Sequence, residues 1–423
     1  MKSQSPWYWV PTLYFAEGLP YFIVNNISLV MFKNMGMPNG QLAFFTSLLY
    51  LPWVIKPLWS PFVDIIRTKR WWIRTMQIIM SAAMLALPFI LPYGNGVSME
   101  TGGLFFACLG IFWVTAFASA THDIAADGFY MLALNPHDQK EFVGIRSTFY
   151  RLASWFGQGA LVAIAGIIDQ STWNISLAWK MTLLLPALIF AAITLAHVFT
   201  IPHAAEDAER PDSSISRVAR DFLEAFKTFF MKKQIVIALL FMLFFRLPEA
   251  LLLKMAQPFL LDSRADGGLG LTNTEVGLAY GTIGIIALTI GGILGGLASA
   301  KWGLRKSMWP MALSLALPSG VFLLMSVLGI SDIWLVSACI AFDQFGYGFG
   351  FTAYMLYLIY FSNGSFKTAH YSICTAFMAL SMMLPGLVAG YLQESLGYTG
   401  FFSLVMVCCL VTVLVTFLVK VEE

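Results

Sequence analysis

Long apolar stretches dominate this chain and leave few folds open to it. The 423 residues are 58% hydrophobic and 11% charged, which is well outside the range of soluble domains. Because a helix needs about 20 apolar residues to cross the hydrocarbon core of a bilayer, the pattern predicts an all-α membrane protein with about twelve spans. The predicted spans are 8–32, 41–62, 71–93, 102–133, 143–168, 179–200, 234–261, 274–300, 308–329, 332–361, 369–393 and 398–420.

Positively charged residues gather in alternate loops between these spans. One set of loops holds Arg67, Lys69, Arg70, Arg74, Lys140, the basic residues between Arg210 and Lys233, Lys301, Arg305, Lys306 and Lys367. The opposite set holds Lys33, Lys180 and Arg264. Since short cytoplasmic loops collect Lys and Arg, we expect both termini in the cytoplasm of a multi-pass cell-membrane protein, the inner membrane in a Gram-negative cell. The first span, without a cleavage site, is expected to be retained.

Several classes of function lack their sequence signals. The five cysteines all lie in predicted spans without CxxC spacing, so we expect packing roles rather than disulfides or metal binding. The net charge of +2, with basic residues confined to loops, gives no support for nucleic-acid binding. A GxxxxGK[ST] motif is absent, so ATP drive is not expected. We expect no cofactor and no metal, and a monomer whose partners are a small polar solute, protons and membrane lipids.

One long polar stretch, residues 203–216, divides the chain. It predicts an N-terminal six-helix bundle at 1–202, a cytoplasmic linker at 203–233 and a C-terminal six-helix bundle at 234–423. Within the linker, apolar residues recur at three- and four-residue steps among charged ones, at Val218, Phe222, Phe226 and Phe229. This spacing indicates an amphipathic helix on the lipid surface, and the alternative is a linker helix packed on the protein.

The two halves repeat short motifs in the same order. The pairs are Leu19-Pro20 with Leu247-Pro248, Gly36 to Gln41 with Gly270 to Glu275, Lys69-Arg70 with Arg305-Lys306, and Asp123 with Asp343. Thr272 and Glu275 are predicted to form a capping box. The repeat predicts two pseudo-symmetric bundles around a central cavity, which is the layout of a secondary transporter.

Ionisable residues stand inside the predicted spans. They are Glu17, Lys56, His122, Asp123, Asp127, Arg151, Arg246, Glu249, Lys254 and Asp343. A charge at bilayer depth costs roughly 2.5–3.5 kcal/mol even on insertion scales, so such residues normally face a cavity and mark a transport path.

Several motifs resemble a known family. The segment Ser60 to Arg70 resembles the loop motif between the second and third helices of the major facilitator superfamily, and Gly295 to Lys306 resembles its second copy. Ala16 to Pro20, Tyr50 to Trp59 and Thr121 to Gly128 are similar to the AmpG-type muropeptide permeases and the related acetyl-CoA transporters. The resemblance implies alternating access, with the first, fourth, seventh and tenth helices lining the path. It also implies a conformational latch in the loops, at Asp64, Arg67, Lys69, Arg70, Arg305 and Lys306.

The chain departs from the AmpG pattern in the fourth span. His122 stands where the family has Gln, and Phe129 to Leu134 carry no charge. The identity of the solute therefore stays open.

Asp123 and Asp127 are the first candidates for proton coupling. Four residues apart, they share one face of a helix, and two neighbouring acids in a poorly hydrated site do not both ionise without cost. By depth, Asp127 is predicted to pair with Arg151, which leaves Asp123 free to titrate. The alternative is that these charges only clamp two helices together. Glu17, beside Gly18, and Asp343 complete the proton-coupling set.

Solute contacts are predicted on the same helices. Arg151 and Lys254 are candidates for binding an anionic group. Arg246 and Glu249 either contact the solute or neutralise each other, and Lys56 is interpreted as reaching the cytoplasmic interface. Tyrosines that suit a sugar ring, or that only pack, are Tyr14, Tyr21, Tyr130, Tyr347 and Tyr354.

These observations predict a proton-coupled carrier and no enzyme activity. Following the resemblance, the solute is an anhydromuropeptide-type cell-wall fragment carried inward. An acetyl-CoA or drug/peptide carrier of the same family is the first alternative. A membrane enzyme acting on lipid-linked sugars is the second, although His122, Asp123 and Asp127 lack the further ligands that a zinc site needs. A receptor, which usually carries a soluble output domain, is the third.

Overall fold

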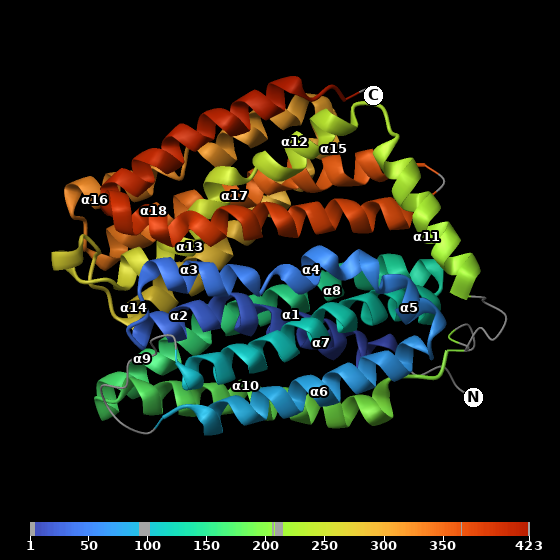
Figure 1. The fold of residues 1–423 in the computed structure, drawn as a ribbon, viewed down its shortest axis with the longest axis horizontal. Helices are drawn as coiled ribbons and strands as arrows, with labels where there is room; N and C mark the ends of the chain where they lie inside the picture. Colours follow the sequence, from blue (N-terminus) through green and yellow to red (C-terminus); the bar gives the residue numbers. More distant parts are fainter. Residues whose placement is uncertain (1–4, 93–101, 205–206, 208–214, 365, 422–423) are drawn as a thin grey trace. The chain divides into compact units, whose positions relative to one another are not determined.

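The computed structural model of the protein describes residues 5–92, 102–204, 207, 215–364 and 366–421 (Figure 1). It does not describe the side chains of Asp64, Ile65, Pro136, Lys140 and residues 215–219. Every regular element in the described residues is a helix, which confirms the all-α prediction.

The helices follow the predicted spans, with short 3₁₀ and π turns between some of them. In the first half of the chain they are α1 (Val10–Phe22), α2 (Ser28–Asn34), α3 (Asn39–Leu48), α4 (Leu51–Ile55), α5 (Ser60–Ile65), α6 (Lys69–Ile90), α7 (Gly103–Ala133), α8 (Pro136–Trp155), α9 (Leu161–Thr172) and α10 (Ile175–Thr200). The others are α11 (Ile215–Phe230), α12 (Ile235–Phe244), α13 (Leu247–Leu261), α14 (Asn273–Leu278), α15 (Ile285–Ala316), α16 (Gly320–Leu328), α17 (Ile333–Ser362) and α18 (Lys367–Leu418).

Eight stretches of the described chain are long and apolar enough to cross a membrane. Two of them, Asn273–Leu328 and Lys367–Leu418, each contain two predicted spans, because α15 and α18 continue through bends at Gly303 and Gly397. The second predicted span is divided among α3, α4 and α5, and the tenth corresponds to α17. Helices therefore occupy all of the predicted spans.

Left-handed backbone residues recur at matching positions of the two halves. Gly36, with φ 83°, precedes α3, and Gly270, with φ 69°, precedes α14. Arg67, with φ 64°, precedes α6, and Gly303, with φ 75°, takes the same place in the second copy of the loop. Glycine adopts this conformation readily, whereas arginine does so only at a cost. The shared geometry supports the internal repeat seen in the sequence.

By contacts, the chain divides into two compact units. Unit 1 contains residues 1–36 and 55–222, and unit 2 contains residues 37–54 and 223–423. Helix α3 is thus part of unit 2 although it belongs to the first half of the sequence. The bundle boundaries predicted around 203–233 stay a prediction.

Glycines allow α3 to lie directly against α18. A Cβ atom added at Gly390 would stand 1.9 Å from the carbonyl oxygen of Asn39, and one at Gly386 would stand 2.2 Å from Oγ of Ser47. The amide of Asn39 also donates to Oε1 of Gln393 over 2.7 Å. The two helices therefore meet backbone to backbone at Gly390, and a larger residue there would have to push them apart.

Candidate functional site

The first group of charges lies within unit 1, on α1, α7 and α8. Nη2 of Arg146 is 2.8 Å from Oδ1 of Asp127, and the hydroxyl of Tyr14 donates to the same oxygen over 3.2 Å. The Arg146 guanidinium also lies over the Tyr14 ring, 4.4 Å from its centre. An ion pair and a cation–π contact thus hold one carboxylate and one guanidinium together.

The partner of Asp127 is Arg146, so the prediction of an Asp127–Arg151 pair is wrong. That prediction counted helix depth from a loop at 135–142. In the structure α7 ends at Ala133 and α8 begins at Pro136, so the turn is shorter than predicted. Arg146, which is nearer the turn than Arg151, therefore lies at the depth of Asp127. Arg146 was missed because it lies only three residues after the predicted start of the span 143–168 and was not counted among the ionisable residues inside the spans.

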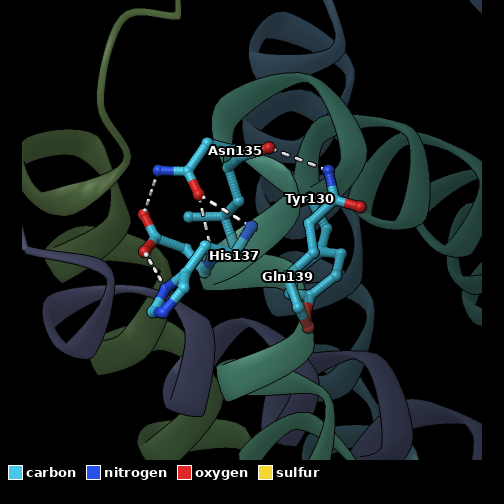
Figure 2. A network of polar contacts seen from close by, with 6 residues as sticks. Tyr130, Asn135, His137 and Gln139 are labelled. Atoms are coloured by element: carbon cyan, nitrogen blue, oxygen red, sulfur yellow. Dashed lines mark hydrogen bonds and ion pairs between the residues drawn. The ribbon is translucent and has the colours of Figure 1, made fainter.

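The short turn between α7 and α8 is fixed by side chains (Figure 2). Oδ1 of Asn135 accepts from the backbone N–H groups of His137 and Asp138, each over 2.9 Å, and so caps α8. The amide of Gln139 donates to the carbonyl of Leu134, and the hydroxyl of Tyr130 donates to the carbonyl of Gln139. This turn sets the register that brings Arg146 to Asp127.

A second basic residue accompanies the acids of unit 1. Nζ of Lys56 is 3.8 Å from Oδ2 of Asp123. The interpretation of Lys56 as an interfacial residue did not include this contact and stays a prediction. Asp123 has a cation beside it rather than standing free. Glu17 is buried, its Oε2 accepts no hydrogen bond from the described residues, and it lies within electrostatic reach of Asp123 and Asp127.

His122 belongs to a buried polar chain that runs across four helices. Its Nε2 lies 3.0 Å from the amide of Gln77, which lies 2.9 Å from Nδ1 of His197, whose Nε2 is 2.8 Å from the hydroxyl of Thr12. Sequence reasoning did not single out Gln77 and His197. Both are polar residues inside predicted spans, and this could have marked them as candidates for a buried polar contact. These hydrogen-bonded side chains connect α7 to α1, α6 and α10, and so help to orient the helix that contains Asp123.

A second group of charges lies within unit 2. Nη2 of Arg246 donates to the hydroxyl of Tyr347 over 2.6 Å, and the guanidinium lies 4.7 Å from the ring centre of Phe351. Both carboxylate oxygens of Glu249 are buried without a hydrogen-bond partner among the described residues. Asp343 accepts a hydrogen bond from its neighbour Gln344 and lies within electrostatic reach of Glu249. Arg246 lies within electrostatic reach of Glu249, so the alternative that the two charges neutralise each other stays open.

Lys254 is buried between helices of unit 2. Its Nζ donates to Oγ1 of Thr46 over 3.2 Å and lies 5.1 Å from the ring centre of Tyr50. Its described contacts include no carboxylate. Ser47, which follows Thr46, and Gln257, three residues after Lys254, have buried side-chain polar atoms without hydrogen-bond partners within the described residues. Several donors near an ammonium suit an anionic group.

The five candidate tyrosines have different surroundings. Tyr14 and Tyr130 both face Arg146, and Tyr347 contacts Arg246. The hydroxyl of Tyr354 donates to the carbonyl of Met242 and its ring stacks on Phe245 and Phe351, while the Arg246 guanidinium lies 5.8 Å from its ring centre. The remaining tyrosine, Tyr21, meets Phe22 edge to face at 5.2 Å.

The predicted latch residues have different surroundings in the structure. Arg67, Arg305 and Lys306 are exposed, whereas Lys69 is buried against Gly128. The side chain of Asp64 lies outside the described residues. Arg70 lies next to His203, with Nη1 2.6 Å from the ring Nε2.

Asp207, which sequence reasoning missed, fastens the chain after α10 to the beginning of α6. Its carboxylate accepts from the backbone N–H groups of Lys69 and Arg70 over 2.7 and 2.9 Å. A carboxylate at a helix N-terminus is favoured by the free N–H groups and by the helix dipole.

Solved structures with the same architecture decide the fold. A bacterial homologue of the human lysosomal transporter Spinster matches with a TM-score of 0.70 at 14% identity, over 96% of this chain and 94% of that one. A D-xylose-proton symporter matches with a TM-score of 0.70 at 12% identity, over 98% and 97%. The protein has the major facilitator fold. This confirms the predicted fold class.

Curated relatives of this chain have names that refer to transport. The putative transporter AmpG 4 of Rickettsia felis is 25% identical over 405 residues, covering 93% of this chain and 92% of the relative. The anhydromuropeptide permease of Escherichia coli K12 is 24% identical over 394 residues, covering 92% and 74%. No family model matches. These similarities confirm the resemblance to AmpG-type permeases, and the apolar helices support a multi-pass membrane protein.

Proposed function

We propose that the protein is a proton-coupled secondary transporter that works by alternating access and imports a polar solute. The observation that carries the proposal is the group of Glu17, Asp123 and Asp127 with Lys56 and Arg146 inside helices of a membrane protein. Acids and bases at bilayer depth are costly and typically serve ion or solute paths. Glu17 is the leading proton carrier because its carboxylate is buried and incompletely hydrogen-bonded. Asp123 is the second carrier, beside Lys56.

The remaining acids have supporting parts in the proposal. Asp127 is held by Arg146 and Tyr14, so it shapes the field around Glu17 more than it exchanges protons itself. Asp343 is a third proton candidate, in unit 2 near Glu249.

The proposed solute is an anhydromuropeptide-type cell-wall fragment. Support comes from the name of the Escherichia coli relative and from the mixture of cations and tyrosines among the candidate residues. Lys254 and Arg151 are proposed to bind anionic groups, with Arg246 and Glu249 completing the polar contacts. Tyr14, Tyr130 and Tyr347 are proposed to face the sugar rings, and Tyr21 is a further candidate. An acetyl-CoA or drug/peptide carrier is the alternative within the same class.

The orientation and the latch complete the proposal. Both termini are cytoplasmic, because the basic loops lie on that side, and the protein works as a monomer in the cell membrane. The exposed Arg67, Arg305 and Lys306 act with Lys69 and Arg70 at the cytoplasmic edge, where pairing changes as the halves rock. Asp64 is proposed to take part as well.

Proton coupling is tested by replacing Asp123 with asparagine. The purified protein is reconstituted in vesicles and uptake of labelled muropeptides, sugars and acetyl-CoA is measured with and without an imposed pH gradient. We expect Asp123→Asn to abolish gradient-driven uptake of the accepted solute and to leave counterflow exchange intact, because exchange needs no net proton release. If gradient-driven uptake persists at the wild-type rate in both Asp123→Asn and Glu17→Gln, the proton roles are refuted.

Anion binding is tested by replacing Lys254 with glutamine. Hydrogen bonds to a charged group contribute about 1.5–3 kcal/mol, so we expect KM for an anionic solute to rise by roughly ten- to a hundredfold. Lys180 is the matched control, since it is also buried but its Nζ donates to the carbonyl of Leu91 in unit 1. An equal change in KM for Lys180→Gln and Lys254→Gln contradicts the assignment.

A further inference from the structure

Unit 2 contains three buried ionisable side chains, here called the Glu249 cluster, that stand apart from the proposed proton carriers of unit 1. Glu249 on α13 lies within electrostatic reach of Arg246, at the start of the same helix, and of Asp343 on α17. Arg246 is 4% exposed, and Glu249 and Asp343 are each 1% exposed. Bulk water therefore contributes little to stabilising these charges.

Glu249 has the fewest hydrogen bonds in this cluster. Neither of its carboxylate oxygens accepts a hydrogen bond from the described residues. Asp343 accepts one from the side-chain amide of Gln344, over 3.1 Å. An ionised carboxylate that is buried without donors is costly, and a second one nearby adds like-charge repulsion. The least costly state of the pair therefore has fewer than two negative charges.

The bases near the pair leave one acid uncompensated. In the described part of the chain, the base within electrostatic reach of Glu249 is Arg246. Lys254 stands five residues further along α13, about 140° around the helix, and its contacts are with Thr46 and Tyr50. Two acids and one base give the Glu249 cluster a formal charge of −1, whichever acid Arg246 compensates. One proton makes the cluster neutral.

Other titratable groups near the pair do not supply the missing positive charge. Tyr280, in the π turn Ala279–Gly284, lies within electrostatic reach of both acids, and so do Tyr347 on α17 and Cys409 on α18. The hydroxyl of Tyr347 already accepts a hydrogen bond from Arg246. A phenol or a thiol is neutral or negative, so none of these groups replaces a proton on the acids.

The charges of unit 1 show the same excess of one acid. Glu17, Asp123 and Asp127 interact there with the bases Lys56 and Arg146. The side chains of Asp123 and Asp127 are 16% and 41% exposed, so water can stabilise part of that excess charge. The acids of unit 2 lack this exposure. A missing proton is therefore tolerated less well in unit 2 than in unit 1.

We infer that Glu249 and Asp343 together hold one proton, which makes unit 2 a second protonation site of the protein. Release of the proton breaks one carboxyl O–H bond, transfers the proton to water and leaves one uncompensated negative charge, so it requires that the cluster become hydrated. The use of this proton rests on the proposed function: a carrier with one such site in each unit moves two protons with each solute.

Infrared spectroscopy of the full-length protein tests the proton directly. A protonated carboxyl has a C=O stretching band that an ionised carboxylate lacks, and this band shifts in deuterated water. Spectra are recorded at neutral pH in a detergent without ester groups. We expect the band to lose the intensity of one carboxyl in Glu249→Gln and equally in Asp343→Asn, because either substitution leaves one acid and one base, which need no proton.

The matched control is Tyr280→Phe, which changes a neighbour of both acids but not the charge of the cluster. We expect it to keep the band. Arg246→Gln, which removes the base, is expected to raise the intensity by one further carboxyl. A band of equal intensity in the unaltered protein and in both amide variants overturns the inference. A loss in only one of the two amide variants also overturns it, since the proton would then belong to one acid alone.

Transport measurements separate this inference from the proposed function. The unaltered protein is placed in vesicles with the membrane potential held at zero, and a labelled anhydromuropeptide is the probe. Transport of two protons lets a pH difference of one unit maintain a solute ratio of about a hundredfold, against about tenfold for one proton. A tenfold ratio refutes transport of the second proton. An absence of any pH-driven accumulation refutes the proposed function, and the infrared result then decides on the proton of unit 2 by itself.

Discussion

Replacing Arg146 with alanine is expected to reduce gradient-driven uptake at least tenfold. The substitution removes the ion pair of Asp127, which keeps the hydrogen bond from the Tyr14 hydroxyl, while Lys56 stays beside Asp123. Both members of the ion pair are partly exposed, so we expect the free energy of unfolding to fall by about 1–2 kcal/mol, less than for a fully buried pair. A tenfold loss of rate corresponds to about 1.4 kcal/mol.

The pairing itself is measured with a double-mutant cycle. Arg146→Ala and Asp127→Asn are combined, and thermal stability is compared with that of the single variants. We expect a coupling energy between about 0.5 and 3 kcal/mol for this pair, and none for Arg151→Ala with Asp127→Asn. Coupling of Asp127 to Arg151 instead would restore the pairing that the sequence alone favoured. Arg146→Lys is expected to recover only part of the uptake, since lysine keeps the charge but loses the planar stacking on Tyr14.

Replacing Gly390 with alanine is expected to be the most destabilising of the proposed single substitutions. The new Cβ atom would stand 1.9 Å from the carbonyl of Asn39 and 2.8 Å from Cα of Gly40, and backbone atoms cannot rotate away as a side chain can. Overpacking of this kind typically costs about 1–3 kcal/mol. Because the shift would also break the hydrogen bonds of Asn39 to Gln393 and Tyr398, we expect a cost at the upper end. The midpoint of thermal unfolding in detergent measures it.

Gly296 provides the matched control for Gly390. It is also a helical glycine, in α15, but a Cβ atom added there would meet nothing within 4 Å. Gly296→Ala is therefore expected to be neutral or to stabilise by up to about 1 kcal/mol, through the loss of chain entropy in the unfolded state. Equal midpoints for the two alanine variants would mean that α3 and α18 are not in the close contact described.

The sequence predicted the local structure of the chain well. Apolar length marked each span, and the Thr272–Glu275 capping box formed as its pattern predicted. The repeated loop motifs have matching left-handed residues, at Arg67 and Gly303. These features depend either on residues close together in the chain or on the free energy of moving each side chain from water into lipid. Both can be evaluated from the sequence alone.

The partners of the buried charges could not be predicted in the same way. The sequence showed that Asp127 needed a cation, but a two-residue turn capped by Asn135 decided that Arg146 and not Arg151 reaches it. Gln77 and His197 stand 120 residues apart and form one polar chain. Helix register and long-range packing are set by the whole assembly of side chains, which no local pattern records.

The amino-acid sequence by itself determined that the chain crosses a membrane many times, in two similar halves, with costly charges in its spans. Hydrophobic length and the price of a charge in lipid are sufficient for that conclusion. Only the tertiary structure decided that α3 packs with unit 2 and that Lys56 accompanies Asp123. Those outcomes depend on which helix backbones approach each other closely. A glycine such as Gly390 permits a close approach, but the sequence does not show which helix packs against it.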